Sequence, residues 1–330
     1  MAARPLSRPF NALLAALILV AAACTPSGSA STAPTTAPNA TTSLPTSAPP
    51  TSAPAFPVTL TDDEGTDVTL TAEPQKIVSL TPDATETLFA IGAGSRVVGK
   101  VEDIANFPAD AASVPIVATF NGVDVEKIVA AGADLVVSGG TGLSQGPAVE
   151  QLRHAGIPVF VSYPKTIDGA LESIRRIGQA VGLADDASTL ADKVANDIND
   201  LQALAGTAAT QPRVFYEIDV TGGIFTPPAD SIYAEMFDLA GATFIPGDAS
   251  YSISLEKLVD ADPEVILLGD GAYGVTAAQV KAREGWGGMT AVKAGRIVAV
   301  DDIVITRPGP RLAEGLKALV AAIHPELVLP

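Results

Sequence analysis

The residues that could carry enzyme chemistry in this chain do not form a catalytic pattern. Ser254 and Lys257 have the S-x-x-K spacing of penicillin-binding enzymes, but the companion S-D-N and K-T-G motifs are absent. We therefore predict that Ser254 caps the N-terminus of a helix. His154 falls inside a predicted helix and His324 falls at a helix end, and neither has a catalytic partner in the sequence pattern.

Nucleotide and metal motifs are missing as well. The glycine-rich run 139–142 lacks the lysine and the spacing of a P-loop, and no G-x-S-x-G or H-E-x-x-H run occurs. One cysteine and two histidines are too few for a zinc or manganese receptor, which needs about three or four His and carboxylate ligands. We predict no enzymatic activity, no metal site and no cofactor.

Charge and composition narrow the class of protein further. The 330 residues are 47% hydrophobic and 17% charged, which suits a globular protein with a large interior. Lys and Arg number 20 against 37 Asp and Glu, so the formal net charge is −17. Such an acidic surface repels phosphate backbones, and we therefore expect no nucleic-acid partner.

Two aromatic residues stand at matching places in an internal repeat. The helix predicted at 125–131 reappears at 255–261, offset by 130 residues, and each copy leads into a β-branched strand. Phe120 lies just before the first copy and Tyr251 just before the second. If the repeats form two lobes, both rings face a cleft and suit a broad, flat ligand. Two alternatives stay open: a single continuous sheet, and rings that each pack inside one lobe.

Strand and helix patterns alternate through both repeats, which predicts βαβ units and mostly parallel sheets. A short hairpin over 58–70 precedes them. The predicted strands are 77–80, 97–99, 135–138, 159–163, 214–218, 265–268 and 297–300, and the predicted helices are 83–91, 125–131, 148–155, 231–239, 255–261 and 310–323.

A long helical stretch lies between the repeats. Ile167, Leu171 and Ile174 have helical spacing in a first helix over 166–181. A second helix over 186–205, capped by Asp185 or Asp186, would span about 30 Å. We predict an α/β protein with two Rossmann-like lobes joined by a single long rigid helix, and a ligand cleft between the lobes. A rigid connection limits the lobes to small movements.

The N-terminus has the pattern of an export signal. Arg4 and Arg8 precede the apolar run 13–23, which is too short for a membrane span and ends at Cys24, the only cysteine. Small residues leading into a cysteine resemble the lipobox of bacterial lipoproteins, so we predict that Cys24 is the lipidated mature N-terminus. Residues 25–55 are almost purely Ser, Thr, Ala and Pro, which is typical of an extended tether.

The predicted organisation follows from these boundaries. We expect a signal peptide at 1–23, the lipidated cysteine and tether at 24–55, an N-terminal lobe at 56–165, connecting helices at 166–209 and a C-terminal lobe at 210–330.

Several motifs in order resemble one family of binding proteins. They are Pro74–Glu86, Gly122–Val137, Leu255–Leu268 and Arg307–Arg311. The chain resembles the iron-siderophore and cobalamin binding proteins of ABC importers, and is most similar to the cobalamin-binding branch. That resemblance implies two α/β lobes joined by one long helix, and a monomer lipid-anchored to the outer face of the cytoplasmic membrane. It also implies cobalamin, a ferric siderophore or haem as the ligand.

The resemblance also implies roles for single residues. Phe120, Tyr251 and Arg307 match ligand-contacting positions, and Tyr163 and Tyr216 are further candidates. Docking to the transmembrane subunits of the permease is implied for one surface carboxylate in each lobe. These are Glu86 in the first lobe and Asp230, or alternatively Glu235, in the second. An alternative function is a surface-anchored sensor or enzyme that uses the same fold.

Overall fold

The computed structural model describes residues 56–142 and 145–330. The described residues belong to one compact unit. The predicted signal peptide, Cys24 and the tether lie outside the described residues. Within the described ranges, none of the helices combines the length and the apolar character needed to cross a membrane.

The first lobe is built on a six-stranded sheet in the order β6-β5-β4-β3-β7-β8. Neighbouring strands run parallel, except that β5 and β6 pair antiparallel. The predicted hairpin forms from β1 (Val58–Thr61) and β2 (Asp67–Leu70). The sheet strands are β3 (Ile77–Ser79), β4 (Val97–Val101), β5 (Ile116–Thr119), β6 (Gly122–Val123), β7 (Leu135–Ser138) and β8 (Val159–Val161).

Both faces of this sheet are covered by helices, so its strands are apolar on both sides. Ile77 packs in a core with Leu88 of α1, whereas Val78 packs in a second core with Ile128 of α2. Helix α1 begins directly after β3 because the Thr81 hydroxyl accepts a hydrogen bond from the Ala84 amide. The helices are α1 (Pro82–Ala90), α2 (Val125–Ala130) and α3 (Gly146–His154).

The second lobe has a four-stranded parallel sheet in the order β10-β9-β11-β12. As predicted, Ser254 caps α7, accepting a hydrogen bond from the Lys257 amide. The strands are β9 (Arg213–Glu217), β10 (Thr243–Phe244), β11 (Val265–Leu268) and β12 (Ile297–Ala299). The helices are α6 (Ile232–Leu239), α7 (Leu255–Ala261), α8 (Ala277–Lys281), α9 (Thr290–Ala294), α10 (Asp302–Thr306) and α11 (Leu312–Ile323).

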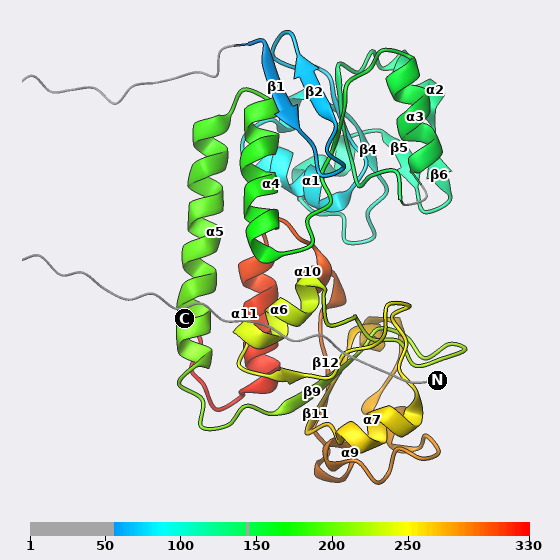
Figure 1. Cartoon of the computed structure of the whole chain (residues 1–330), viewed down its shortest axis with the longest axis vertical. Helices are drawn as coiled ribbons and strands as arrows, with labels where there is room; N and C mark the ends of the chain where they lie inside the picture. The colour runs from blue at the N-terminus through cyan, green and yellow to red at the C-terminus, as the bar shows by residue number, and fades with distance from the viewer. Residues whose placement is uncertain (1–55, 143–144) are drawn as a thin grey trace, which may run out of the picture. The chain divides into compact units, whose positions relative to one another are not determined.

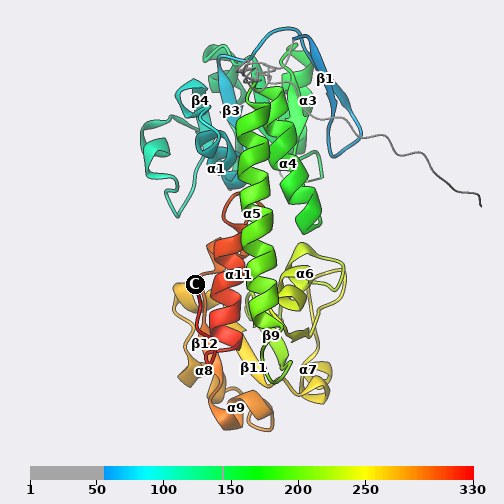
Figure 2. The ribbon, with the colours of Figure 1, turned by 90° about the vertical axis from the view of Figure 1, so that its left-hand side faces the viewer.

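Helices α4 (Ile167–Ala180) and α5 (Ala184–Ala205) connect the lobes. Ala187 and Ala191 of α5 belong to the core of the first lobe, while Ile198 and Leu201 belong to that of the second. Figures 1 and 2 show α5 running alongside both lobes. The long connecting helix is therefore confirmed. Its predicted cap is wrong: the residue before α5 is Leu183, and the two aspartates lie in the first turn.

The repeat is visible in the element order. Helix α2 leads into β7 and helix α7 leads into β11, with the same spacing in each lobe. The sequence patterns missed β5, β6, β10, α8, α9 and α10, which are all five residues or shorter. Elements this short contain too few residues for a periodic pattern to develop.

Candidate ligand-binding cleft

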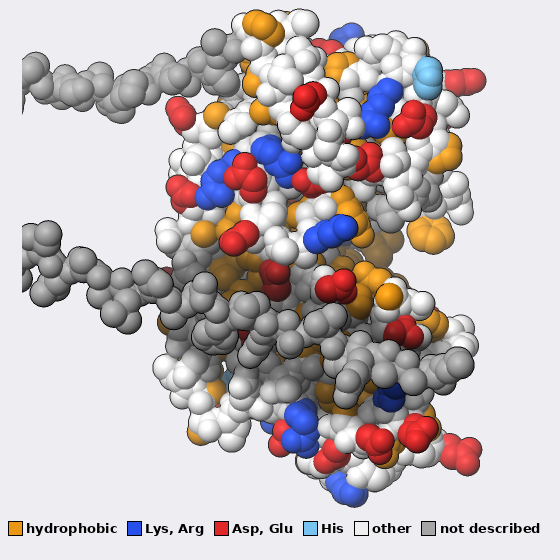
Figure 3. Space-filling model, in the orientation of Figure 1, with side chains coloured by type: hydrophobic (Ala, Val, Ile, Leu, Met, Phe, Trp, Pro, Cys, Tyr) orange, Lys and Arg blue, Asp and Glu red, His pale blue; other side chains and the backbone are white. Residues whose placement is uncertain are grey.

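A cleft of about 450 Å³ lies between the two lobes. In the space-filling view, hydrophobic side chains gather along the junction of the lobes (Figure 3). A second hollow, of about 490 Å³, is lined by β5, β6 and the start of α2, which belong to one lobe. The lining of the cleft is Thr81, Pro82, Asp83, Gly139, Ser162, Tyr163, Pro164, Lys165, Pro228, Asp230, Ser231, Ile232, Tyr233, Ala249, Tyr251, Thr306 and Pro308.

The wall from the first lobe comes from the carboxyl ends of parallel strands, where α/β sheets usually bind ligands. Asp83 sits in the first turn of α1, directly after β3. Ser162, Tyr163 and Lys165 follow β8. The buried hydroxyl of Ser162 has no hydrogen-bond partner among the described residues.

The wall from the second lobe comes from the start of α6 and from two loops. Ser231 caps α6, and Tyr233 lies in its first turn. Tyr251 has a left-handed backbone with φ of 61°, which is uncommon for a bulky residue. Its carbonyl accepts a hydrogen bond from the Thr226 amide at 2.9 Å. Backbone conformations of this kind persist where the surroundings fix them, often at ligand sites.

Three tyrosines from both lobes converge on the cleft. Burial, followed by the nearby Tyr251 and Tyr163, raises the pKa of Tyr233 to about 12. Burial and the same Tyr163 raise the pKa of Tyr251. The phenols of Tyr233 and Tyr251 are therefore neutral hydrogen-bonding groups at physiological pH.

The charges that line the cleft are mostly acidic. Burial between the lobes raises the pKa of Asp83 to about 6, although part of its surface stays accessible from the cleft. Asp230 is exposed. Among the lining residues that the structure describes, Lys165 is the one cation. No group of three or more His, Cys, Asp or Glu in the described ranges is arranged to hold a metal ion.

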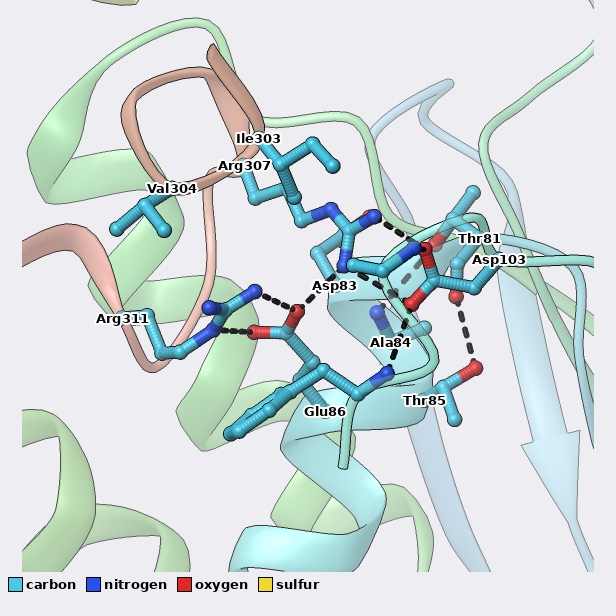
Figure 4. A network of polar contacts seen from close by, with 12 residues as sticks. Thr81, Asp83, Ala84, Thr85, Glu86, Asp103, Ile303, Val304, Arg307 and Arg311 are labelled. Carbon is cyan, nitrogen blue, oxygen red and sulfur yellow. Dashed lines mark hydrogen bonds and ion pairs between the residues drawn. The ribbon is translucent and has the colours of Figure 1, made fainter. Parts of the chain in front are cut away.

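Arg307 does not face the cleft, although its neighbours Thr306 and Pro308 line it. Its guanidinium donates to Glu86 Oε1 at 2.8 Å and to Asp103 Oδ2 at 3.0 Å. Arg311 donates to Glu86 from Nε at 3.0 Å and from Nη2 at 2.7 Å. Figure 4 shows the two arginines reaching Glu86 and Asp103 from the α10–α11 segment.

Comparison with known proteins decides the family. The sequence matches the family described as periplasmic binding protein over residues 77–304. An ABC transporter substrate-binding lipoprotein of Bacillus subtilis is 35% identical over 277 residues, covering 82% of this chain and 87% of the relative. The chain belongs to the periplasmic binding protein family.

Two further proteins that are similar to this chain are named after the ligand that they bind. A cobalamin-binding protein of Halobacterium salinarum is 30% identical over 282 residues, covering 82% of this chain and 75% of the relative. The solved structure of a periplasmic haem-binding protein from a Roseiflexus species has a TM-score of 0.67 and 26% identity, covering 76% of this chain and 98% of that one.

The sequence-predicted ligand residues of this binding protein fall into two groups. Tyr163 and Tyr251 line the cleft. Phe120 is 95% exposed on the turn between β5 and β6 and does not line it. Tyr216 is fully buried, and its hydroxyl donates to Asp302 at 2.6 Å. Neither Arg307 nor Tyr216 lines this cleft, and each side chain is hydrogen-bonded to a neighbouring carboxylate, so their contact with a ligand stays a prediction.

The predicted docking carboxylates also differ from expectation. Glu86 is 2% exposed and bonded to both arginines, so predicting it as a surface charge is wrong. Glu235 accepts a hydrogen bond from the Ile167 amide at 2.7 Å, at the start of α4. Asp230 is exposed, but it lines the cleft. The docking role of all three residues stays a prediction.

Sequence reasoning missed Asp83, Lys165 and Tyr233. A second weak repeat contained a signal for two of them: the segment 88–91 reappears at 236–239, offset by 148 residues, and the segments entering the two helices, α1 and α6, both line the cleft. Lys165 lies in a connection without a repeated pattern, and only the fold brings it to the cleft.

Proposed function

We propose that this protein is the substrate-binding component of an ABC importer, and that it captures cobalamin in the cleft between its lobes. The observation that carries the proposal is the lining of the cleft, in which both lobes contribute tyrosines and neutral hydroxyls. Tyrosine offers large contact area with little loss of rotamer freedom, together with a hydroxyl that can donate or accept. The corrin ring is flat, and its edge carries neutral amide side chains that need such partners.

The charges around the cleft favour cobalamin over haem. Haem carries two carboxylates, which would need cationic partners in the cleft. Lys165 is the one lining cation among the described residues, while Arg307 and Arg311 are paired with Glu86 and Asp103. Asp83 and the tyrosine hydroxyls of the lining instead suit the donors and acceptors of an amide.

An iron complex is the second candidate ligand. Tyr163, Tyr233 and Tyr251 all line the cleft, and phenol oxygens are donors that suit ferric iron. The similarity to the haem-binding Roseiflexus protein supports the same candidate.

An absorbance titration tests these assignments. Purified protein is mixed with cyanocobalamin, haemin or a ferric hydroxamate, and bound ligand is measured after gel filtration. We expect saturable binding of cyanocobalamin with a stoichiometry of one. Binding of haemin or the ferric chelate in preference to cyanocobalamin would contradict the first candidate and support the second.

The size of cobalamin gives Phe120 a role at the rim. A cleft of about 450 Å³ cannot enclose a molecule this large, so part of the ligand must extend outside it. The exposed Phe120 ring on the β5–β6 turn is available to cover that part.

Delivery requires a membrane location and a permease. We propose that the chain is exported, lipidated at Cys24 and held on the outer face of the membrane by the 25–55 tether. Asp230 remains the exposed candidate for docking, whereas Glu86 would first have to leave Arg307 and Arg311. The variant Cys24→Ser should yield a soluble, unlipidated product. Retention of that variant in membranes with an acyl group attached would contradict the anchor.

A further inference from the structure

Four charged side chains connect the two lobes beside the cleft. We define Glu86, Asp103, Arg307 and Arg311 as the interlobe bridge. Glu86 and Asp103 belong to the first lobe, and the two arginines flank the short connection between α10 and α11 in the second. Arg307 contacts both acids, and Arg311 contacts Glu86 through two nitrogens.

The bridge is buried and balanced in charge. The side chains of Glu86 and Asp103 are 1% and 4% exposed, and those of Arg307 and Arg311 are 11% and 12% exposed. Burial alone would raise the pKa of Asp103, but the Arg307 guanidinium and the Ala105 amide hold it below its ordinary value. Removing one partner of such a group leaves an uncompensated buried charge, which costs far more than breaking a surface pair.

The bridge is also continuous with the walls of the cleft. Arg307 lies between Thr306 and Pro308, which both line the cleft. Glu86 lies one helical turn after Asp83, which lines the opposite wall. The two walls approach so closely at Gly309 that an added Cβ atom would lie 3.2 Å from Asp83 Cβ. Residues of both cleft walls therefore lie directly beside residues of the bridge.

A loop of the first lobe is held in the same way. Asp103 accepts hydrogen bonds from the amides of Ala105 and Phe107 at 3.0 and 3.3 Å. The Arg311 guanidinium lies over the Phe107 ring, 4.0 Å from its centre. Arginines of the second lobe thus hold both α1 and the 103–107 loop of the first.

We propose that Glu86, Asp103, Arg307 and Arg311 are positioning residues that fix the spacing of the two cleft walls and thereby set ligand affinity. They do not contact the ligand themselves. Helices α4 and α5 already join the lobes through apolar packing, so the fold survives loss of the bridge while the wall spacing changes. The proposal rests on the proposed function only for the choice of ligand in the binding arm of its test.

The first arm of the test needs no ligand. Spin labels are placed on the equivalent exposed positions Glu126 of α2 and Glu256 of α7 in a full-length Cys24→Ser background. Pulsed electron resonance then measures the distance between the lobes. We expect Glu86→Gln and Arg311→Gln each to widen and lengthen the distance distribution. The matched control is Glu217→Gln, which removes a fully buried carboxylate held at 2.5 and 2.9 Å by Arg283 inside the second lobe.

The second arm measures cyanocobalamin affinity in the same variants. We expect about a tenfold loss in Glu86→Gln and in Arg311→Gln, with a double variant no weaker than either single one, because contacting residues couple. Glu217→Gln should keep both affinity and distance. Arg311→Gln is the less buried change and keeps the test valid if Glu86→Gln does not fold.

The outcomes separate the two proposals. Unchanged distances would overturn the positioning role, whether affinity falls or not. Unchanged affinity despite altered distances would overturn it as well. If the unaltered protein binds haemin and not cyanocobalamin, the proposed ligand is wrong, whatever the distances in the variants are. The haemin affinities of the same variants then test the positioning role of the bridge.

Discussion

The loops that carry Phe120 and Tyr251 are equivalent in the repeat, but the structure places them very differently. Tyr251 lines the cleft, whereas Phe120 is 95% exposed outside it. The two loops differ in the segments with which their backbones form hydrogen bonds. Residues Thr119 and Gly122 pair with each other at a tight turn, so this loop contacts mainly itself.

The Tyr251 loop is attached to a second segment of its lobe. Ser252 pairs with Phe225, and the Asp248 carboxylate accepts hydrogen bonds from the Ser250 and Ser252 amides at 2.8 and 3.1 Å. Duplicated helices and strands therefore keep their places because apolar cores hold them, while loops diverge according to their own hydrogen bonds. An aromatic residue before a repeated helix is a ligand candidate only where the loop directs it into the cleft.

The largest expected effect is on Tyr251. Tyr251→Ala should weaken cyanocobalamin binding by about 1–3 kcal/mol, the range for an anchor in a binding site. The melting temperature should change little, because the residue is 40% exposed and lies outside the core clusters. Calorimetric titration and thermal melts measure both quantities. Tyr273→Ala, at a 67% exposed tyrosine that does not line the cleft, is the matched control. Intact affinity with a large loss of melting temperature would show that Tyr251 is structural.

A change at Asp248 tests whether ligand affinity depends on the conformation of the Tyr251 loop as well as on the tyrosine ring. Asp248→Ala removes the acceptor for two loop amides and leaves the Tyr251 side chain itself unchanged. We expect affinity to fall roughly threefold to tenfold, because the ring is no longer held in its binding position. Asp124→Ala removes the N-cap of α2, the counterpart of Ser254 at the start of α7, and serves as the control because it changes a loop carboxylate beside Phe120 instead of Tyr251. A larger loss of affinity from the Asp124 change would reverse the comparison.

The first lobe contributes to the cleft through Asp83, and pH tests that contribution. Burial raises the pKa of Asp83 from the ordinary 3.8 to about 6, so the folded protein binds this proton more tightly than the unfolded chain. Below about pH 4 the group is protonated in both states, and stability falls as pH rises through 6 because a buried carboxylate must ionise.

Asp83→Asn removes that ionisation. We expect its melting temperature to exceed that of the unaltered protein by about 2–4 °C at pH 8 and to match it near pH 4. Thermal melts across this pH range make the comparison. A difference that is the same at both pH values would show that desolvation of Asp83 does not control stability.

The sequence patterns predicted the longer helices and strands correctly. They did not predict contacts between residues that are far apart in the chain. Leu135–Ser138 and Val265–Leu268 were bounded correctly because buried parallel strands are continuous apolar runs. Arg307 and Glu86 were assigned to different partners, a ligand and a permease, although they bind each other. They are separated by 221 positions, and no local pattern reports a contact between residues so distant.

Tyr216 was predicted at the ligand but lies in the core of the second lobe. It lies on a strand whose neighbours are buried, Val214 and Phe215, and the alternating pattern of a half-exposed strand is absent. The strand lies between β10 and β11 in its sheet, so its side chains face helices on both sides and Tyr216 belongs to the core. The residue type alone does not distinguish this buried tyrosine from Tyr163 and Tyr233, which line the cleft.

The smallest expected effect is on Phe120, and it sharpens the comparison with Tyr251 most directly. A ring that is 95% exposed contributes almost nothing to the fold, so Phe120→Ala should change the free energy of unfolding by less than about 0.5 kcal/mol. If the ring covers the part of cobalamin outside the cleft, affinity should fall by about threefold, well below the effect at Tyr251. Calorimetric titration of Phe120→Ala beside Tyr251→Ala measures the ratio. Equal losses would mean that the β5–β6 turn closes over the ligand and that the two lobes bind it symmetrically, which would contradict the unequal roles assigned to the two loops.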